Sequence, residues 1–291
     1  MLKKIAVLIT SYNRKQKTLN CLTSLYNSDL PVLSGDIDIF LVDDGSTDGT
    51  AAAVAEQFPQ VKVIKGTGNL YWARGMMLAW ETADASGEKY DAYFLLNDDV
   101  ILRKDIFINI QTTHEYCLKN YYQEGIYICS TQDPLNKKIT YGGTLINKKR
   151  IRVKKYRIIP SQEPVQCTMA NANILIVTEQ VVKRIGKFDP VFVQKFADYD
   201  YTYRASKAGI PVLVCPAIGG YCKNDHPKGW LSFGTSLKKR LEYLYSPKGL
   251  EYHQQLYYLK KHFKFQLPYY FFMLWMKTLF PIFWDMLKKE E

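Results

Sequence analysis

Acidic side chains follow two apolar segments in a pattern that suits the chemistry of cations and phosphates. The segment YFLLNDDV, residues 93–100, runs from apolar residues directly into Asp98 and Asp99. A second apolar run, DIDIFLVDD, ends in Asp43 and Asp44. Adjacent carboxylates repel each other unless a positive group lies against them, and Mg²⁺ or Mn²⁺ fills that place where carboxylates meet a diphosphate. The pattern therefore indicates either a solvated loop or a site that a cation completes.

The segments that must position these acids alternate between strand and helix patterns. The runs KIAVLIT, DIDIFLVDD, VKVIKG and DAYFLLNDD have the length and composition of strands. Between them, KQKTLNCLTSLYNS, TDGTAAAVAEQF and ARGMMLAWETADAS have the character of helices. Such alternation predicts βαβ units and a parallel sheet, in which ligands bind at the carboxyl ends of the strands. Those ends carry Thr10 to Arg14, Asp43 to Asp48, Gly66 to Asn69, and Asn97 to Asp99.

The middle of the chain is less regular but continues the α/β pattern. GIYICSTQD, ITYGGTLINKK and IPVLVCP read as strands, ANILIVTEQVVKRIG as a strand leading into a helix, and ADYDYTYRASKAG as a polar helix. No linker-like composition interrupts the chain before about residue 235. We therefore expect one mixed α/β domain over 1–235, with halves at 1–100 and 101–235, and a helical extension over 236–291.

The extension contains an aromatic and basic segment, YYFFMLWMKTLFPIFWDML, at residues 269–287. Lys277, Pro281 and Asp285 interrupt it, whereas a spanning helix needs about 20 apolar residues in a row. Two interpretations stay open. The segment packs on its own domain or on a second subunit of a homodimer, or it lies in a membrane interface with its lysines on anionic lipid.

Composition limits the compartment and the partners. The net charge is +11, and nine Lys or Arg with no acid lie between Lys137 and Arg157. Such a surface fits nucleic acid, anionic lipid or phosphorylated small molecules. The six cysteines form no CxxC pair, which suits reduced thiols in the cytoplasm. The start MLKKIAVLITSYN reads as a first strand, because its apolar run is too short for a signal peptide.

Two common nucleotide-binding motifs are missing from the sequence. TSYNRK stands where a dinucleotide-binding fold would carry G-x-G-x-x-G, and no G-x-x-x-x-G-K-[ST] occurs. The expected site therefore offers stacking, hydrogen-bonding and acidic groups in place of a glycine-rich phosphate cradle.

An ordered set of motifs resembles a known family. VLITSYNR, LVDDGSTDGT, GNLYWARG, LLNDDV and GKFDPVFVQKFADYDYTYRASKAG occur in this order. Together they resemble the inverting family 2 glycosyltransferases of bacteria, which have the nucleotide-sugar-binding GT-A fold. The similarity covers most of residues 4–226. It implies a metal-dependent transfer of a sugar, hexosyl or rhamnosyl, from a UDP- or dTDP-linked donor to a hydroxyl of a glycan.

The resemblance assigns a donor-binding role to several residues. It places Thr10 and Tyr12 in the nucleobase pocket and makes Asp44 the acceptor for the pyrimidine N3–H. It adds Asn69 to this set and places Arg74 near the base or the diphosphate.

The same resemblance assigns the metal site. It places Asp98 near the ribose and diphosphate and makes Asp99 a ligand of Mg²⁺ or Mn²⁺, with His226 as a second ligand. The family's D-x-D motif is spelled N-D-D here, and Asn97 is a poorer ligand than an aspartate.

An inverting transfer also needs a base, because the acceptor hydroxyl loses its proton as it attacks. The resemblance points to Asp198, with Ala197 standing where the family shows a glutamate. Asp200 is the competing candidate. Residues i and i+2 face different sides of a helix, so only one should point into the cleft. Alternatively, Asp198 is an ordinary polar helix residue and Asp200 pairs with Arg204 at i+4.

The expected setting is assembly of a cell-surface polysaccharide, capsule or O-antigen, on a lipid-linked acceptor. The enzyme would be cytoplasmic, or peripheral on the inner face of the cytoplasmic membrane. A sugar-phosphate nucleotidyltransferase would want a glycine-rich, lysine-containing loop after the first strand. A nucleic-acid-binding protein would use the basic run at 137–157, but this leaves the strand-end acids unexplained.

Overall fold

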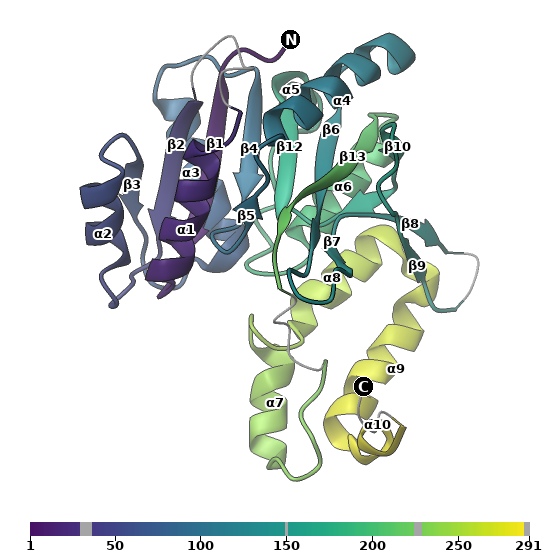
Figure 1. Ribbon diagram of the computed structural model, residues 1–291. Helices are drawn as coiled ribbons and strands as arrows, with labels where there is room; N and C mark the ends of the chain where they lie inside the picture. The colour runs from purple at the N-terminus through teal and green to yellow at the C-terminus, as the bar shows by residue number, and fades with distance from the viewer. Residues whose placement is uncertain (30–36, 149–150, 224–228, 288–291) are drawn as a thin grey trace.

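One half of the main sheet is built from parallel strands that alternate with helices, as the sequence predicts (Figure 1). The computed structural model describes residues 1–29, 37–148, 151–223 and 229–287. The strands lie side by side in the order β3-β2-β1-β4. Their bounds are β1 (Ile5–Ser11), β2 (Ile37–Asp43), β3 (Lys62–Lys65) and β4 (Ala92–Leu96). The helices between them are α1 (Lys15–Tyr26), α2 (Thr50–Gln57) and α3 (Tyr71–Ala85).

The other half of the sheet is mixed. The strand β12 runs antiparallel between β4 and β6, whereas β13 runs parallel to β6 on its far side. The strands of this half are β5 (Ile101–Leu102), β6 (Ile126–Gln132), β7 (Ile139–Tyr141), β10 (Val165–Gln166), β12 (Ile174–Thr178) and β13 (Val212–Tyr221). A small separate sheet contains β8 (Gly143–Asn147), β9 (Lys154–Arg157) and β11 (Met169–Ala170). The mixed α/β architecture expected for a GT-A fold is confirmed.

Helices cover both faces of the sheet, so its strands are buried on both sides. In β1, Ile5, Val7 and Ile9 pack in one core with α1 and α2, whereas Ala6 and Leu8 pack in the other with α3. All five residues are 0% exposed. This explains the unbroken apolar runs, because a parallel strand covered on both faces has no polar side. The remaining helices of this region are α4 (Ile106–Tyr121), α5 (Glu179–Ile185) and α6 (Ala197–Lys207).

Two of the differences between the structure and the expected elements have a clear physical reason. No helix was expected over α4, whose isoleucines and threonines have β-branched side chains that disfavour helix. Packing prevails there, because Phe107, Ile110 and Cys117 fall on one buried face. The single strand expected over ITYGGTLINKK is divided into β7 and β8 at Gly142, whose φ of +150° places it outside the regular strand region.

Helices also form the C-terminal extension, which lies below the sheet in Figure 1. They are α7 (Leu237–Tyr245), α8 (Tyr252–His262), α9 (Leu267–Leu279) and α10 (Ile282–Leu287), with a 3-10 turn η2 (Lys264–Gln266). The aromatic segment expected at 269–287 is broken between α9 and α10 at Phe280 and Pro281. Within the described ranges, no helix is long and apolar enough to cross a membrane.

Candidate active site

The loops that follow β1 and β2 are joined to each other at the carboxyl edge of the sheet. The Asn13 backbone N–H donates to Ser46 Oγ at 2.9 Å, and the Thr47 N–H donates to Asn13 Oδ1 at 2.7 Å. Because Ser11 and Asp43 are paired in register, both strands end at the same level. The strand ends that the sequence marked as polar therefore form one continuous edge.

Asp44 organises the loop before α3. Its Oδ1 accepts from the Gly68 N–H at 2.8 Å, and its Oδ2 accepts from Leu70 and Tyr71 N–H at 2.9 and 3.0 Å. The side chain is buried, and a Cβ on Gly66 would lie 2.7 Å from Asp44 Oδ1. The carboxylate thus satisfies backbone donors at the start of a helix, where a negative charge is favoured. This structural role stands beside the expected contact with a nucleobase, which stays a prediction.

Arg14 is the positive group that lies against the acidic pair after β4. A single guanidinium nitrogen, Nη1, lies 3.1 Å from Asp98 Oδ1 and 2.9 Å from Asp99 Oδ2. Lys17 Nζ lies farther out, 4.0 Å from Asp99 Oδ2. The positive charges of Arg14, directly before α1, and of Lys17, in its first turn, offset the repulsion between the neighbouring carboxylates.

The two carboxylates differ in their surroundings. Asp98 is 4% exposed, and burial raises its pKa to about 6, an effect that Asp99 strengthens and Arg14 opposes. Among the described residues, Asp98 Oδ2 makes no hydrogen bond, although the Ser11 hydroxyl lies close enough to lower the pKa of Asp98. A buried carboxylate oxygen without a donor is costly unless a ligand satisfies it. This oxygen therefore favours a cation at the pair.

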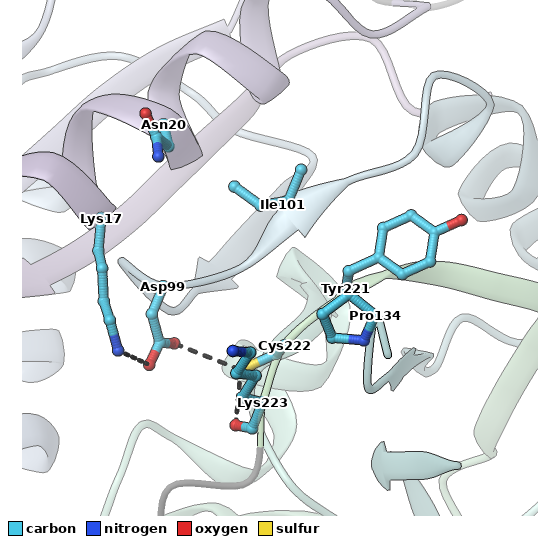
Figure 2. Close-up of a pocket in the computed structure, with 8 residues that line it drawn as sticks. All are labelled: Lys17, Asn20, Asp99, Ile101, Pro134, Tyr221, Cys222 and Lys223. Atoms are coloured by element: carbon cyan, nitrogen blue, oxygen red, sulfur yellow. Dashed lines mark hydrogen bonds and ion pairs between the residues drawn. The ribbon is translucent and has the colours of Figure 1, made fainter. Parts of the chain in front are cut away.

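Asp99 borders a cavity of about 410 Å³ (Figure 2). Lys17 and Cys222 approach Asp99 from opposite sides, and the Cys222 Sγ lies 3.6 Å from Asp99 Oδ1. The lining residues are Lys17, Asn20, Asp99, Ile101, Pro134, Tyr221, Cys222 and Lys223. Asp99, unlike Asp98, thus faces a space large enough to admit a ligand.

Asn97 does not extend the acidic pair as a third ligand. Its Oδ1 accepts from the Trp72 indole Nε1–H at 2.8 Å, which turns the amide toward α3. Within the described ranges, no group of three or more His, Cys, Asp or Glu side chains is arranged to hold a metal ion. Two carboxylates fit Mg²⁺ or Mn²⁺ only as part of a ligand set that substrate phosphates complete, which is a common arrangement for Mg²⁺.

Asp198 is connected to the acidic pair through the loop before β12. Its Oδ2 accepts from the Ala172 N–H at 3.2 Å, and the next residue, Asn173, accepts from the Asn97 N–H at 3.1 Å. Asp198 Oδ1 accepts from the Tyr199 N–H at 2.8 Å. Burial raises the pKa of Asp198, and its two backbone hydrogen bonds oppose that effect. The geometry gives a carboxylate held in place by the backbone near the strand that carries the acids.

The Asp200 carboxylate does not share the contacts of Asp198 and instead binds three other side chains. The residue is 0% exposed, and its carboxylate contacts Arg204 Nε at 2.8 Å, Lys261 Nζ at 2.7 Å and His262 Nε2 at 2.7 Å. Burial raises the pKa of Asp200, but these partners outweigh burial and the net shift is downward. The expected pair with Arg204 is present, and a carboxylate with three cationic or donor partners is poorly suited to accept a proton.

The other expected donor-site residues lie along the same edge. The Thr10 side chain packs against α3, where a Cβ on Gly75 would lie 2.2 Å from Thr10 Oγ1. Tyr12 is 46% exposed, and Lys248 Nζ from the extension lies 5.4 Å from its ring centroid. Asn69 and Arg74 are exposed, before and within the first turns of α3. His226 lies outside the described residues.

Sequence reasoning did not assign a role to Arg14 or Lys248. A signal for Arg14 existed, because two repelling carboxylates call for a cation and Arg14 follows the first strand. The contacts of Trp72 and Lys248 depend on how α3 and the extension pack, which spacing along the chain does not reveal.

Solved structures share this fold. The mannosyltransferase PcManGT from Pyrobaculum calidifontis, in complex with GDP-Man and Mn²⁺, is 16% identical with a TM-score of 0.51, over 78% of this chain and 58% of that chain. S. aureus TarS is 14% identical with a TM-score of 0.53, over 76% of this chain and 37% of that chain. TarS 1–349 is 14% identical with a TM-score of 0.51, over 76% of this chain and 60% of that chain. This chain spans less than two thirds of each neighbour, and the likeness at such identities shows the fold alone.

The sequence itself identifies the family. A search of curated proteins finds no match. The model of the family described as Glycosyl transferase family 2 matches residues 6–158, which is more than half of the 291 residues. The matched span contains β1 to β4 with Asp44, Asp98 and Asp99. The chain therefore belongs to glycosyl transferase family 2.

Proposed function

We propose that this glycosyltransferase is a metal-dependent, inverting enzyme that uses a UDP- or dTDP-sugar and transfers its sugar to a hydroxyl of a glycan. The observation that carries the proposal is the edge of the sheet where Asp44, Asp98 and Asp99 lie together, with a buried oxygen of Asp98 left without a hydrogen-bond partner among the described residues. The fold neighbour PcManGT, in complex with GDP-Man and Mn²⁺, supports the inclusion of a divalent cation in the proposal.

The donor occupies the edge between β1, β2 and α3. Tyr12, Asn69 and Arg74 are exposed there and can contact the nucleoside or the diphosphate. Asp98 and Asp99 would hold Mg²⁺ or Mn²⁺, with the donor diphosphate completing the ligand set. When bound, the cation offsets the negative charge that develops on the leaving diphosphate.

Asp198 acts as the general base. It takes the proton of the acceptor hydroxyl as the oxygen attacks the anomeric carbon and the bond to the diphosphate breaks, which inverts the configuration. Burial raises the pKa of this carboxyl, and a more basic carboxylate accepts a proton more readily. The Ala172 and Tyr199 N–H groups fix the orientation of the carboxylate. The engagement of Asp200 with Arg204, Lys261 and His262 favours Asp198 over Asp200 for this role.

The acceptor is a lipid-linked glycan of a surface-polysaccharide pathway, reached at the membrane surface. Support comes from α9 and α10, where the exposed side chains include Phe272 at 57%, Phe283 at 52% and Met286 at 68%. Exposed apolar side chains of this size on helices suit a partner or a membrane interface. The basic net charge of the chain suits anionic lipid.

The proposal is tested with a panel of UDP-, dTDP- and GDP-sugars. Each is added to the protein with Mn²⁺, with Mg²⁺ or with chelator, and the shift in melting temperature and the release of nucleotide are measured. Stabilisation by UDP- or dTDP-sugars that depends on metal is the expected result. Equal stabilisation in chelator would overturn the metal dependence. The inverting assignment fails if the anomeric configuration of the product, read by NMR, matches that of the donor.

A further inference from the structure

The pair of carboxylates after β4 is already bridged by a cation of the protein itself. Arg14 Nη1 lies within 3.1 Å of Asp98 and 2.9 Å of Asp99, so one nitrogen serves two residues. The acids are held in place, with side chains only 6% and 15% exposed, whereas the Arg14 side chain is 45% exposed. The bridge therefore joins a fixed acidic pair to a side chain with room to move.

The position of this nitrogen conflicts with a metal ion on the same two carboxylates. Oxygen ligands bind Mg²⁺ at about 2.1 Å, so an ion held between Asp98 Oδ1 and Asp99 Oδ2 would lie close to where Arg14 Nη1 now lies. A guanidinium and a divalent cation repel each other strongly at such separations. Arg14 must leave the pair before a cation can be held there.

The phosphate oxygens of a bound donor would offer Arg14 an alternative partner. It stands in the loop between β1 and α1, directly after Tyr12 and Asn13, at the edge that faces the donor. A planar guanidinium pairs well with phosphate oxygens. Lys17 is a weaker competitor for the acids, since its Nζ lies 4.0 Å from Asp99.

We propose that Arg14 is a positioning residue that occupies the cation's place between Asp98 and Asp99 in the metal-free enzyme and turns to the donor diphosphate when the metal enters. This inference rests on the proposed function, because it assumes the metal and the diphosphate. Metal alone then binds weakly, since Arg14 loses its partners and gains none. Metal and nucleotide together bind tightly, since the diphosphate receives Arg14. The side chain thus couples the two binding events and disfavours a metal site without substrate.

The test is a titration of Mn²⁺ into the metal-free protein, with free Mn²⁺ read from its electron paramagnetic resonance spectrum. The titration is run without nucleotide and with saturating UDP or dTDP. Arg14→Met removes the charge and keeps much of the stem. It should bind Mn²⁺ alone at least about tenfold more tightly than the wild type, because the competing cation is gone. It should also gain much less affinity from the nucleotide.

A matched control is Lys62→Met, which removes another half-exposed cation paired with an aspartate, Asp38, at the start of β3 and away from the carboxyl edge of the sheet. It should titrate like the wild type. Arg14→Lys keeps the charge and should keep the weak binding of metal alone. If Arg14→Met does not fold by circular dichroism, Arg14→Gln replaces it with the same expected gain.

The outcomes separate this inference from the function on which it rests. In one outcome the wild type binds Mn²⁺ and nucleotide together, but a neutral Arg14 variant binds Mn²⁺ alone no more tightly than the wild type does. This result overturns the role of Arg14 and leaves the proposed function standing. A second outcome is that the wild type binds nucleotide without any Mn²⁺ and that the neutral Arg14 variants bind nucleotide much more weakly. Arg14 would then be a permanent substitute for the metal, which also overturns the inference. Wild-type protein that binds neither overturns both.

Discussion

His262 Nε2 lies 2.7 Å from Asp200 Oδ1, and this contact fastens the end of α8 to the first turn of α6. Lys207 Nζ lies 2.8 Å from the other ring nitrogen, and burial lowers the pKa of His262, so the ring is neutral and donates from Nε2 to Asp200. Asp198, in the same first turn of α6, is therefore supported by a segment more than fifty residues later in the chain. The extension is part of the framework of the site.

Replacement of the buried Asp200 should destabilise the fold. Asp200→Asn removes the charge that Arg204 and Lys261 share, which leaves the partly buried Arg204 without its anion and Lys261 with Asp189 alone. We expect a loss of roughly 3 kcal/mol in the free energy of unfolding, measured by urea denaturation. Lys183→Ala breaks an exposed i,i+4 pair with Glu179 and should change the same quantity by less than about 0.5 kcal/mol. Equal effects for both variants would refute a structural role for Asp200.

Loss of the Asp198 carboxylate should separate binding from chemistry. Asp198→Asn is nearly the same size and still accepts a backbone N–H, but it does not take up a proton. The turnover number should fall by about 10²- to 10⁴-fold, as is usual for a general base, with the donor's dissociation constant unchanged. Transfer kinetics and calorimetry with the donor give the two values. Asp105→Asn, on an exposed pair with Arg103, is the control. A fully active Asp198→Asn enzyme would place the base elsewhere.

Asp44 should affect stability as well as binding, because its two oxygens accept from three backbone N–H groups. Asp44→Asn turns an amide NH₂ toward one of these donors, and we expect a loss of about 1–3 kcal/mol. Asp133 also accepts from two backbone N–H groups but is only partly buried, so water replaces its contacts in Asp133→Asn and the loss should be smaller. Urea denaturation compares the two variants. An Asp44→Asn protein as stable as the wild type would show that this cap contributes little.

Glu251 should make stability depend on pH. It is 2% exposed before α8 and accepts from the Lys195 N–H at 2.9 Å, and burial raises its pKa from 4.5 to about 7. Between those values the folded state holds a proton that the unfolded state has released. The free energy of unfolding therefore falls as pH rises through this window, by up to roughly 3 kcal/mol, and levels off above it.

Glu251→Gln has no proton to lose at this position and still accepts from the Lys195 N–H. Its advantage over the wild type should be small near about pH 5 and largest near about pH 8, in urea denaturation at both values. A constant difference at the two pH values would contradict the raised pKa of Glu251.

The exposed aromatic face of α9 and α10 should bind anionic membranes. Phe272→Asp combined with Phe283→Asp places two carboxylates on this face and should abolish cosedimentation with phosphatidylglycerol vesicles, since burial of apolar area and attraction to anionic lipid are both lost. Tyr122→Asp changes an aromatic residue that is 91% exposed at the end of α4 and should sediment like the wild type. Equal sedimentation of all three proteins, or none, would argue that this face contacts protein instead.

The sequence determined most of the first half of the fold and the place of the acids. Unbroken apolar runs alternating with helical segments specify a parallel sheet, and a parallel sheet brings the ends of β1, β2 and β4 to one edge. Asp44, Asp98 and Asp99 lie at that edge because each directly follows its strand. The order of the motifs added the family, which the match over residues 6–158 shows.

Only the tertiary structure decided which contacts each acid makes. Spacing along α6 leaves Asp198 and Asp200 equivalent, and the choice depends on the packing of α8, whose Lys261 and His262 reach Asp200 from far along the chain. The same holds for Arg14, because its guanidinium meets Asp98 and Asp99 across more than eighty residues of sequence. Local patterns report which residues share a strand or a helix face. They carry no information on which faces of distant elements meet, since that is set by the packing of the whole core.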